Sequence, residues 1–222
     1  MDNEQVEEPP PNSENTYVAN EIYQTALEAY RLGNPLESQR LCSEIKEDDP
    51  DFPNALHLLS AILLGQGEVE KALEQCSLAS ALSPGNASIL NGLALAQHAA
   101  GKLVDAIATL SEAITLPQAG AEVYANLSMV LSDLDRLDDA LASANKALEI
   151  DKNVVSALNN KGLVYQKLGR IVQAIDCFDK ALAIQPTSPI FLHNKLSCAN
   201  YSPNLERGEV SRLTDRYWKA KG

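Results

Sequence analysis

Aromatic residues are scarce in this chain of 222 residues: they make up 5% of the sequence, although hydrophobic residues make up 45%. A core of this composition has to be built mainly from Ala and Leu, which suits closely packed helices better than a sheet sandwich. Basic residues are also few. The formal net charge of −12 argues against nucleic acid or an anionic membrane as the main partner.

Other features that the sequence lacks argue against a membrane protein, a secreted protein and a disulfide-rich protein. No hydrophobic run approaches the roughly 20 residues that span a bilayer, and the first residues lack the basic start and apolar stretch of a signal peptide. The cysteines form no CxxC pair and no disulfide-dense spacing. We therefore expect a cytoplasmic protein without a membrane segment, with buried free thiols. The cysteines are Cys42, Cys76, Cys177 and Cys198.

The first 16 residues differ in composition from the rest of the chain. They contain five acidic residues, no basic residue and a run of three prolines at positions 9–11. Such a segment cannot bury enough apolar surface to offset its chain entropy, so it is predicted to be disordered. Residues 1–18 are therefore interpreted as an acidic tail and lead-in.

A repeated pattern of 34 residues organises the chain from residue 19 onward. Residues 155–188 predict two helices with a turn between them and a stop at Pro186. The frame recurs without insertion or deletion over residues 19–52, 53–86, 87–120 and 121–154. We number the first residue of each copy as position 1. Position 15, in the turn, is then Asp135 in the copy 121–154 and Gly in the other four copies, as a backbone with positive φ favours. The copy 155–188 shows the signature residues Leu158, Gly162, Tyr165, Gly169, Ala174, Phe178, Ala181 and Pro186.

Each predicted helix pair can bury its apolar face only against the next pair. The spacing resembles that of the tetratricopeptide repeat family over residues 19–188. The resemblance implies an all-α superhelix of five helix-turn-helix repeats, whose concave wall is built from the first helix of each repeat. Residues 189–222 begin as a sixth first helix and then leave the pattern, so they are expected to cap the array.

The predicted concave face carries asparagines in register. Asn126, Asn160 and Asn194 occupy position 6 of successive frames, and Asn91 and Asn159 occupy position 5. An Asn side chain offers both a donor and an acceptor, which match the C=O and N–H of a peptide unit. The hypothesis is a groove that binds an extended protein segment, with His193 at position 5 as a further lining residue. The alternative is that these amides only bond neighbouring repeats to each other and stiffen the array.

No chemistry-bearing motif accompanies the groove. His57, His98 and His193 all fall on the predicted concave face, but in different repeats, so a shared metal site is not expected. The chain contains no catalytic triad, HExxH, P-loop or GxGxxG pattern. The sequence thus predicts a non-catalytic protein-interaction module without a cofactor. Its acidic balance favours a neutral or basic peptide or protein ligand.

The C-terminal stretch supports a second hypothesis. The string Asn194-x-Leu196-x-x-x-Asn200-Tyr201, followed by Val210 and Trp218, resembles the junction before the catalytic domain in Spindly-type and bacterial O-linked N-acetylglucosamine transferase-like proteins. The resemblance implies the substrate-recruiting part of a glycosyltransferase, although no residue here matches the catalytic residues of that family. A third hypothesis is self-association through an amphipathic helix over residues 209–219, with Leu213 and Trp218 exposed.

Overall fold

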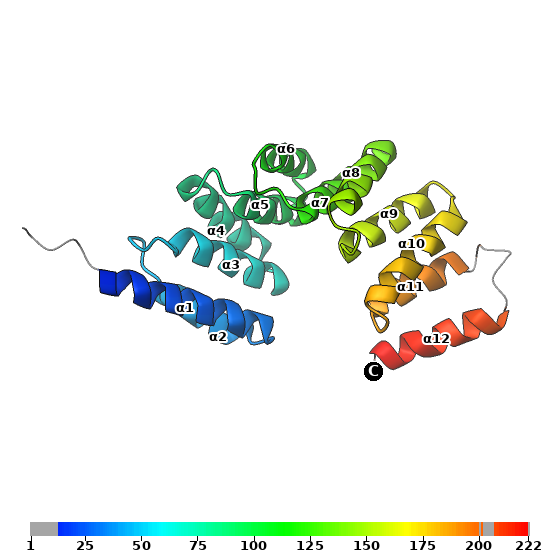
Figure 1. Cartoon of the computed structure of the whole chain (residues 1–222), viewed down its shortest axis with the longest axis horizontal. Coiled ribbons are helices and arrows are strands. Elements are labelled where there is room, and N and C mark those ends of the chain that lie inside the picture. Colours follow the sequence, from blue (N-terminus) through cyan, green and yellow to red (C-terminus); the bar gives the residue numbers. More distant parts are fainter. Residues whose placement is uncertain (1–12, 200, 202–206, 222) are drawn as a thin grey trace, which may run out of the picture. The chain divides into compact units, whose positions relative to one another are not determined.

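The computed structural model describes residues 13–199, 201 and 207–221. Within these ranges the chain forms twelve α-helices and no strand (Figure 1). The predicted all-α class is therefore confirmed. The helices divide into two compact units, of which the first ends at Pro84 and the second begins at Gly85. No helix in the described ranges is both long enough and apolar enough to cross a membrane.

Unit 1 contains two consecutive helix pairs. Its helices are α1 Ser13–Arg31, α2 Pro35–Glu44, α3 Phe52–Gly65 and α4 Val69–Leu82. α1 contacts α2 and α3, and α3 contacts α4. The core cluster between α1, α2 and α3 is mostly small and aliphatic and consists of Ala26, Leu41, Cys42, Ile45, Ala55, Leu58 and Ile62.

Unit 2 continues the same arrangement over eight helices. They are α5 Ala87–Ala99, α6 Leu103–Ile114, α7 Ala121–Asp133, α8 Leu137–Ile150, α9 Val155–Lys167, α10 Ile171–Ile184, α11 Pro189–Ala199 and α12 Arg207–Lys221. Each helix contacts its partner in the pair, and the first helices α5, α7, α9 and α11 also contact one another in that order. Several small clusters fill the interior in place of one central core, as stacked repeats require.

The 34-residue frame matches the helix boundaries in unit 2. α5, α7, α9 and α11 begin at Ala87, Ala121, Val155 and Pro189, the residues at which the frame starts. The turns between paired helices carry the expected positive φ: it is between 69° and 80° at Gly33, Gly67, Gly101 and Gly169, and 60° at Asp135. The prediction for position 15 is therefore confirmed.

The small residues at position 8 leave room for position 24 of the paired helix. In the pair α9 and α10, a Cβ atom added to Gly162 would lie 2.6 Å from Cε1 of Phe178, whose side chain is fully buried. In the pair α3 and α4 the same two positions are Ser60 and Cys76, both buried. Residue size at one position thus compensates for size at the other.

Two expectations about the ends of the chain need correction. Residues 13–16 were predicted to be disordered, but α1 already begins at Ser13; residues 1–12 lie outside the described ranges. Leu213 was expected to be exposed, but it is 3% exposed and belongs to a core cluster with Phe191 and Leu192 of α11. The cause is that α12 packs on α11 as a second helix would, so Leu213 replaces a repeat residue in the core.

Candidate functional site

The position 6 asparagines connect neighbouring first helices in unit 2. Asn126 Nδ2 donates to Asn91 Oδ1 at 2.8 Å, and Asn194 Nδ2 donates to Asn159 Oδ1 at 2.8 Å. Asn160 Nδ2 donates to the backbone carbonyl of Ala125 at 2.9 Å. In each case the donor on one helix reaches position 5 of the first helix before it. These amides therefore stack through position 5 of the preceding repeat and not directly on each other.

The five asparagines differ in what they present to solvent. Asn160 is buried, at 8% exposure, between α7 and α9. Asn126 and Asn194 are partly exposed, and one of the two N–H groups of each side chain already bonds the preceding helix. Asn91 and Asn159 are also partly exposed, and they take part only as acceptors among the described residues. Both side-chain N–H groups of Asn91 and of Asn159 are therefore left for a ligand.

Further polar contacts join the same helices. His98 Nε2 lies 2.7 Å from Asp133 Oδ2, and Lys167 Nζ donates to the carbonyl of Ser132 at 2.5 Å. Ser156 Oγ donates to Glu122 Oε2 at 2.8 Å. Sequence reasoning missed these contacts. A search for complementary side chains at separations of 34 and 35 residues would have found the contacts of His98 and Ser156, because every contact in the row has one of these two separations. The bond of Lys167 would still have been missed, because its acceptor is a backbone carbonyl.

The row ends at an aromatic cluster between α11 and α12. The exposed ring of His193 lies 5.8 Å from the ring of Tyr217, centre to centre, and Tyr217 meets Trp218 edge to face at 5.3 Å. Lys221 Nζ lies 5.7 Å from the centres of both aromatic rings of α12. His193 thus contacts the capping helix as well as solvent. Trp218 remains 61% exposed.

The predicted histidines do not assemble. His57 lies on α3 of unit 1, and burial lowers its pKa below the ordinary value. His98 is paired with Asp133, and the ring of His193 lies tilted against the ring of Tyr217. No group of three or more His, Cys, Asp or Glu side chains in the described part of the chain is arranged to hold a metal ion.

Comparison with known families agrees with the helix pairs. The sequence models of the tetratricopeptide repeat match residues 23–87, 77–121, 121–154 and 155–188. The chain belongs to the tetratricopeptide repeat family. No curated protein matches it.

Solved structures show the same fold. This tetratricopeptide repeat protein is similar to the thermophilic protein TTC0263 of Thermus thermophilus, with 22% identity, 81% of this chain and 98% of that chain covered, and a TM-score of 0.71. It is similar to PilW, a type IV pilus biogenesis factor, with 15% identity, coverage of 92% and 90%, and a TM-score of 0.73. It is also similar to YrrB, a tetratricopeptide repeat protein described as having an unusual peptide-binding site. The identity is 18%, 75% of this chain and 85% of that chain are covered, and the TM-score is 0.53.

Of the remaining sequence-based expectations for this tetratricopeptide repeat protein, the one about the cysteines is confirmed and the others stay predictions. The four cysteines are free and buried, as predicted. Burial raises the pKa of Cys42 and of Cys76 to about 11. The likeness of the stretch from Asn194 to Trp218 to a transferase junction stays a prediction, and so do the cytoplasmic location and self-association. Residues 200 and 202–206 of that stretch lie outside the described ranges.

Proposed function

We propose that the chain is a protein-interaction module whose unit 2 binds an extended peptide segment along α5, α7, α9 and α11. The observation that carries this proposal is the pair Asn91 and Asn159. Each is held in place by a bond to the next first helix, and each keeps its own side-chain N–H groups free of protein partners within the described residues. Donors fixed in this way suit the carbonyl groups of a bound backbone.

The spacing of the two donors fits an extended ligand. Asn91 and Asn159 lie two repeats apart, and packed helix axes are about 10 Å apart, so the two donors are about 20 Å apart. An extended chain rises about 3.3 Å per residue, so about six residues reach from one donor to the other. Between them position 5 is Ala125, which is fully buried, so this position supplies no side-chain donor to the ligand.

The charges beside the row set the proposed chemistry of the ligand. Glu122 and Asp133 are exposed on α7, and they outnumber Lys167, whose Nζ is bonded to the carbonyl of Ser132. A neutral or basic segment is therefore preferred, because an acidic one would meet these carboxylates. The family also supports a binding role, since each repeat adds wall to an extended surface.

The test replaces the donors without removing the acceptors. A library of displayed random peptides is first selected on the protein. The variant N91D/N159D keeps an oxygen for Asn126 and for Asn194 but has no side-chain N–H. We expect the selected peptides to bind it at least about tenfold more weakly, with unfolding in urea little changed. The control Q118E/Q185E adds the same charge in exposed connections of unit 2 and should bind normally.

Two outcomes would contradict the proposal. Selected peptides that bind N91D/N159D as tightly as the original protein would show that these donors hold no ligand. If none of the selected peptides compete with one another for binding, they do not share one surface, and unit 2 has no groove site of this kind. In either case the alternative stands that the asparagine row only joins neighbouring repeats.

A further inference from the structure

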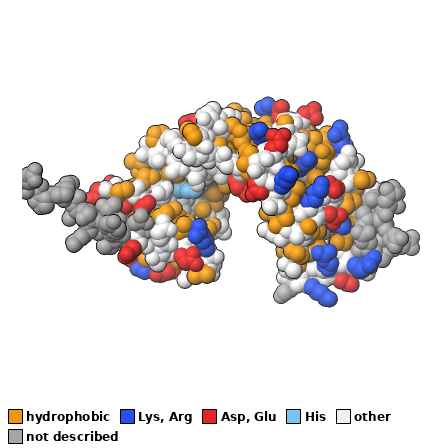
Figure 2. Space-filling view, viewed as in Figure 1, with side chains coloured by type: hydrophobic (Ala, Val, Ile, Leu, Met, Phe, Trp, Pro, Cys, Tyr) orange, Lys and Arg blue, Asp and Glu red, His pale blue; other side chains and the backbone are white. Residues whose placement is uncertain are grey.

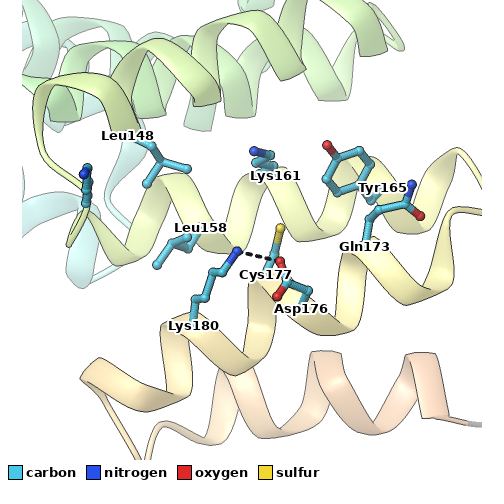
Figure 3. A pocket seen from close by; sticks show the side chains of 9 residues that line it. Leu148, Leu158, Lys161, Tyr165, Gln173, Asp176, Cys177 and Lys180 are labelled. Carbon is cyan, nitrogen blue, oxygen red and sulfur yellow. Dashed lines mark hydrogen bonds and ion pairs between the residues drawn. The ribbon is translucent and has the colours of Figure 1, made fainter.

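A pocket of about 330 Å³ lies between α8, α9 and α10 (Figure 3). Leu148 of α8 borders one side, and the paired helices α9 and α10 supply most of the remaining lining. Leu158 and Cys177 form buried parts of the wall, at 5% and 4% exposure. Burial raises the pKa of the Cys177 thiol, so this residue contributes an apolar surface to the pocket.

This pocket faces away from the asparagine row. Lys161 and Tyr165 line it, and Lys161 follows Asn159 by two residues, a rotation of about 200° around the helix axis. Leu158 and Tyr165 lie on the same side as Lys161 by the same count. A ligand in this pocket would thus occupy a surface opposite the one proposed above, so the two sites can be tested separately.

Three lysines from three segments border the pocket. They are Lys152 in the connection from α8 to α9, Lys161 of α9 and Lys180 of α10. Figure 3 shows Lys161 and Lys180 on facing helices with Cys177 between them. Lys180 is paired with Asp176 at 2.6 Å, and Lys161 Nζ lies 5.8 Å from the centre of the Tyr165 ring. Neither Lys152 nor Lys161 has a carboxylate partner within the described residues.

The pocket lies in the part of the chain that carries no net negative charge. Residues 1–84 hold 4 Lys and Arg against 16 Asp and Glu, whereas residues 85–222 hold 14 of each. The whole net charge of −12 thus belongs to the first 84 residues. Lysine and arginine side chains accordingly lie mostly over unit 2 on the face drawn in Figure 2. An acidic ligand is therefore not repelled by the net charge of the unit that forms the pocket.

We propose that this pocket binds an acidic segment of a partner protein, with one apolar side chain inside and flanking carboxylates against Lys152 and Lys161. The volume is at the small end of the range for ligand pockets, which suits one or two side chains. The lysines come from separate segments, which fits several carboxylates along a chain better than one compact anion. The apolar wall gives the segment a contact that a free inorganic anion cannot make.

The probe is the blocked peptide acetyl-Leu-Asp-Glu-Leu-Asp-Glu-amide, titrated into the whole protein while the methyl NMR signals of Leu148 and Leu158 are followed. We expect both signals to shift and to saturate. The variant K152Q/K161Q should bind about threefold to tenfold more weakly, as the loss of two ion pairs at exposed and partly exposed lysines predicts. The matched control K102Q/K146Q removes the same charge from exposed sites of unit 2 outside the pocket and should bind as the original protein does.

The comparison peptides decide the outcome. A peptide with Asn and Gln in place of Asp and Glu should bind far more weakly, and inorganic phosphate should compete poorly. The proposal is overturned if the Leu148 and Leu158 signals do not respond, if both double variants bind alike, or if the amide peptide binds as well as the acidic one. Efficient competition by phosphate would equally overturn it, because a site for any anion needs no apolar side chain. Circular dichroism of each variant checks that the helices are intact.

Discussion

Asn160 donates its side-chain amide to the backbone carbonyl of Ala125, 2.9 Å away, across the contact between α9 and α7. Asn160 is only 8% exposed and Ala125 is fully buried. A hydrogen bond buried between two repeats fixes the register in which their first helices stack, because sliding one helix would leave the Asn160 amide without this partner. The adjacent asparagine pairs of the row lack this burial.

Replacing Asn160 with Ala should therefore destabilise unit 2 more than the same change at Asn194. The Ala125 carbonyl keeps its helical bond within α7 but loses its side-chain donor, and the buried amide side chain no longer fills its space, which together cost about 1–2 kcal/mol. The partner of Asn194 is the partly exposed side chain of Asn159, which can bond water, so that change should cost about 1 kcal/mol or less. Urea unfolding followed by circular dichroism measures both. Equal losses in the two variants would contradict this account.

The asparagine row also shows how far the sequence reaches. The 34-residue period predicts which residues share a face, and it placed Asn126, Asn160 and Asn194 at equivalent positions correctly. It does not predict which neighbouring group each amide meets. That depends on what stands at position 5 of the preceding repeat, which is Asn91 for Asn126 but Ala125 for Asn160. Three identical residues therefore have different burial and different partners.

Beyond the repeats the sequence predicts less, because periodicity no longer constrains the packing. α12 is recognisable as a helix from its apolar spacing, but nothing in that spacing says which surface it covers. The structure places Leu213 in the core and leaves Trp218 exposed. The pocket bordered by Lys152, Lys161 and Lys180 was equally invisible, since its lysines come from three segments that meet only in the folded chain.

The close approach of α9 and α10 should make Gly162 intolerant of Ala. The added methyl would lie 2.6 Å from the ring of Phe178, which is fully buried and cannot move aside freely. Overpacking of this kind costs about 1–3 kcal/mol, which should exceed the gain of up to about 1 kcal/mol that Ala brings to a helix. We expect G162A to unfold at a lower urea concentration than the original protein.

Two further variants control for the helix-propensity effect. Gly65 at the end of α3 has no atom within 4 Å of an added Cβ, so G65A should leave stability unchanged or slightly raised. In G162A/F178L the smaller side chain should restore part of the loss. If G162A is as stable as the original protein, the contact with Phe178 does not limit residue size at this position.

Asp135 occupies a turn position that its four equivalents give to Gly. Its φ is 60°, a conformation that costs a residue with a side chain about 1–2 kcal/mol, with Asp among the more tolerant types. D135G should therefore raise the free energy of unfolding by about 0.5–1 kcal/mol, after the extra entropy of Gly in the unfolded chain is subtracted. The reverse change G101D, at a φ of 73°, should lower it. A destabilised D135G would show that the Asp135 side chain contributes an interaction that outweighs the backbone strain.

Burial of His57 should make unit 1 sensitive to mild acid. The pKa of His57 is lowered in the folded chain, so the unfolded chain binds a proton more readily than the folded chain. Folding stability is therefore lost as the pH falls below the ordinary histidine pKa of about 6.5 and towards the lower pKa of the folded chain. The urea concentration at half-unfolding should therefore decrease when the pH is lowered from about 7.5 to about 5.5. The decrease should be smaller in H57Q than in the control H193Q, which removes an exposed histidine instead. Because few carboxylates titrate in this window, a difference between the two variants isolates His57. Equal pH dependence in H57Q and H193Q would mean that the ring of His57 gains access to water when it is protonated.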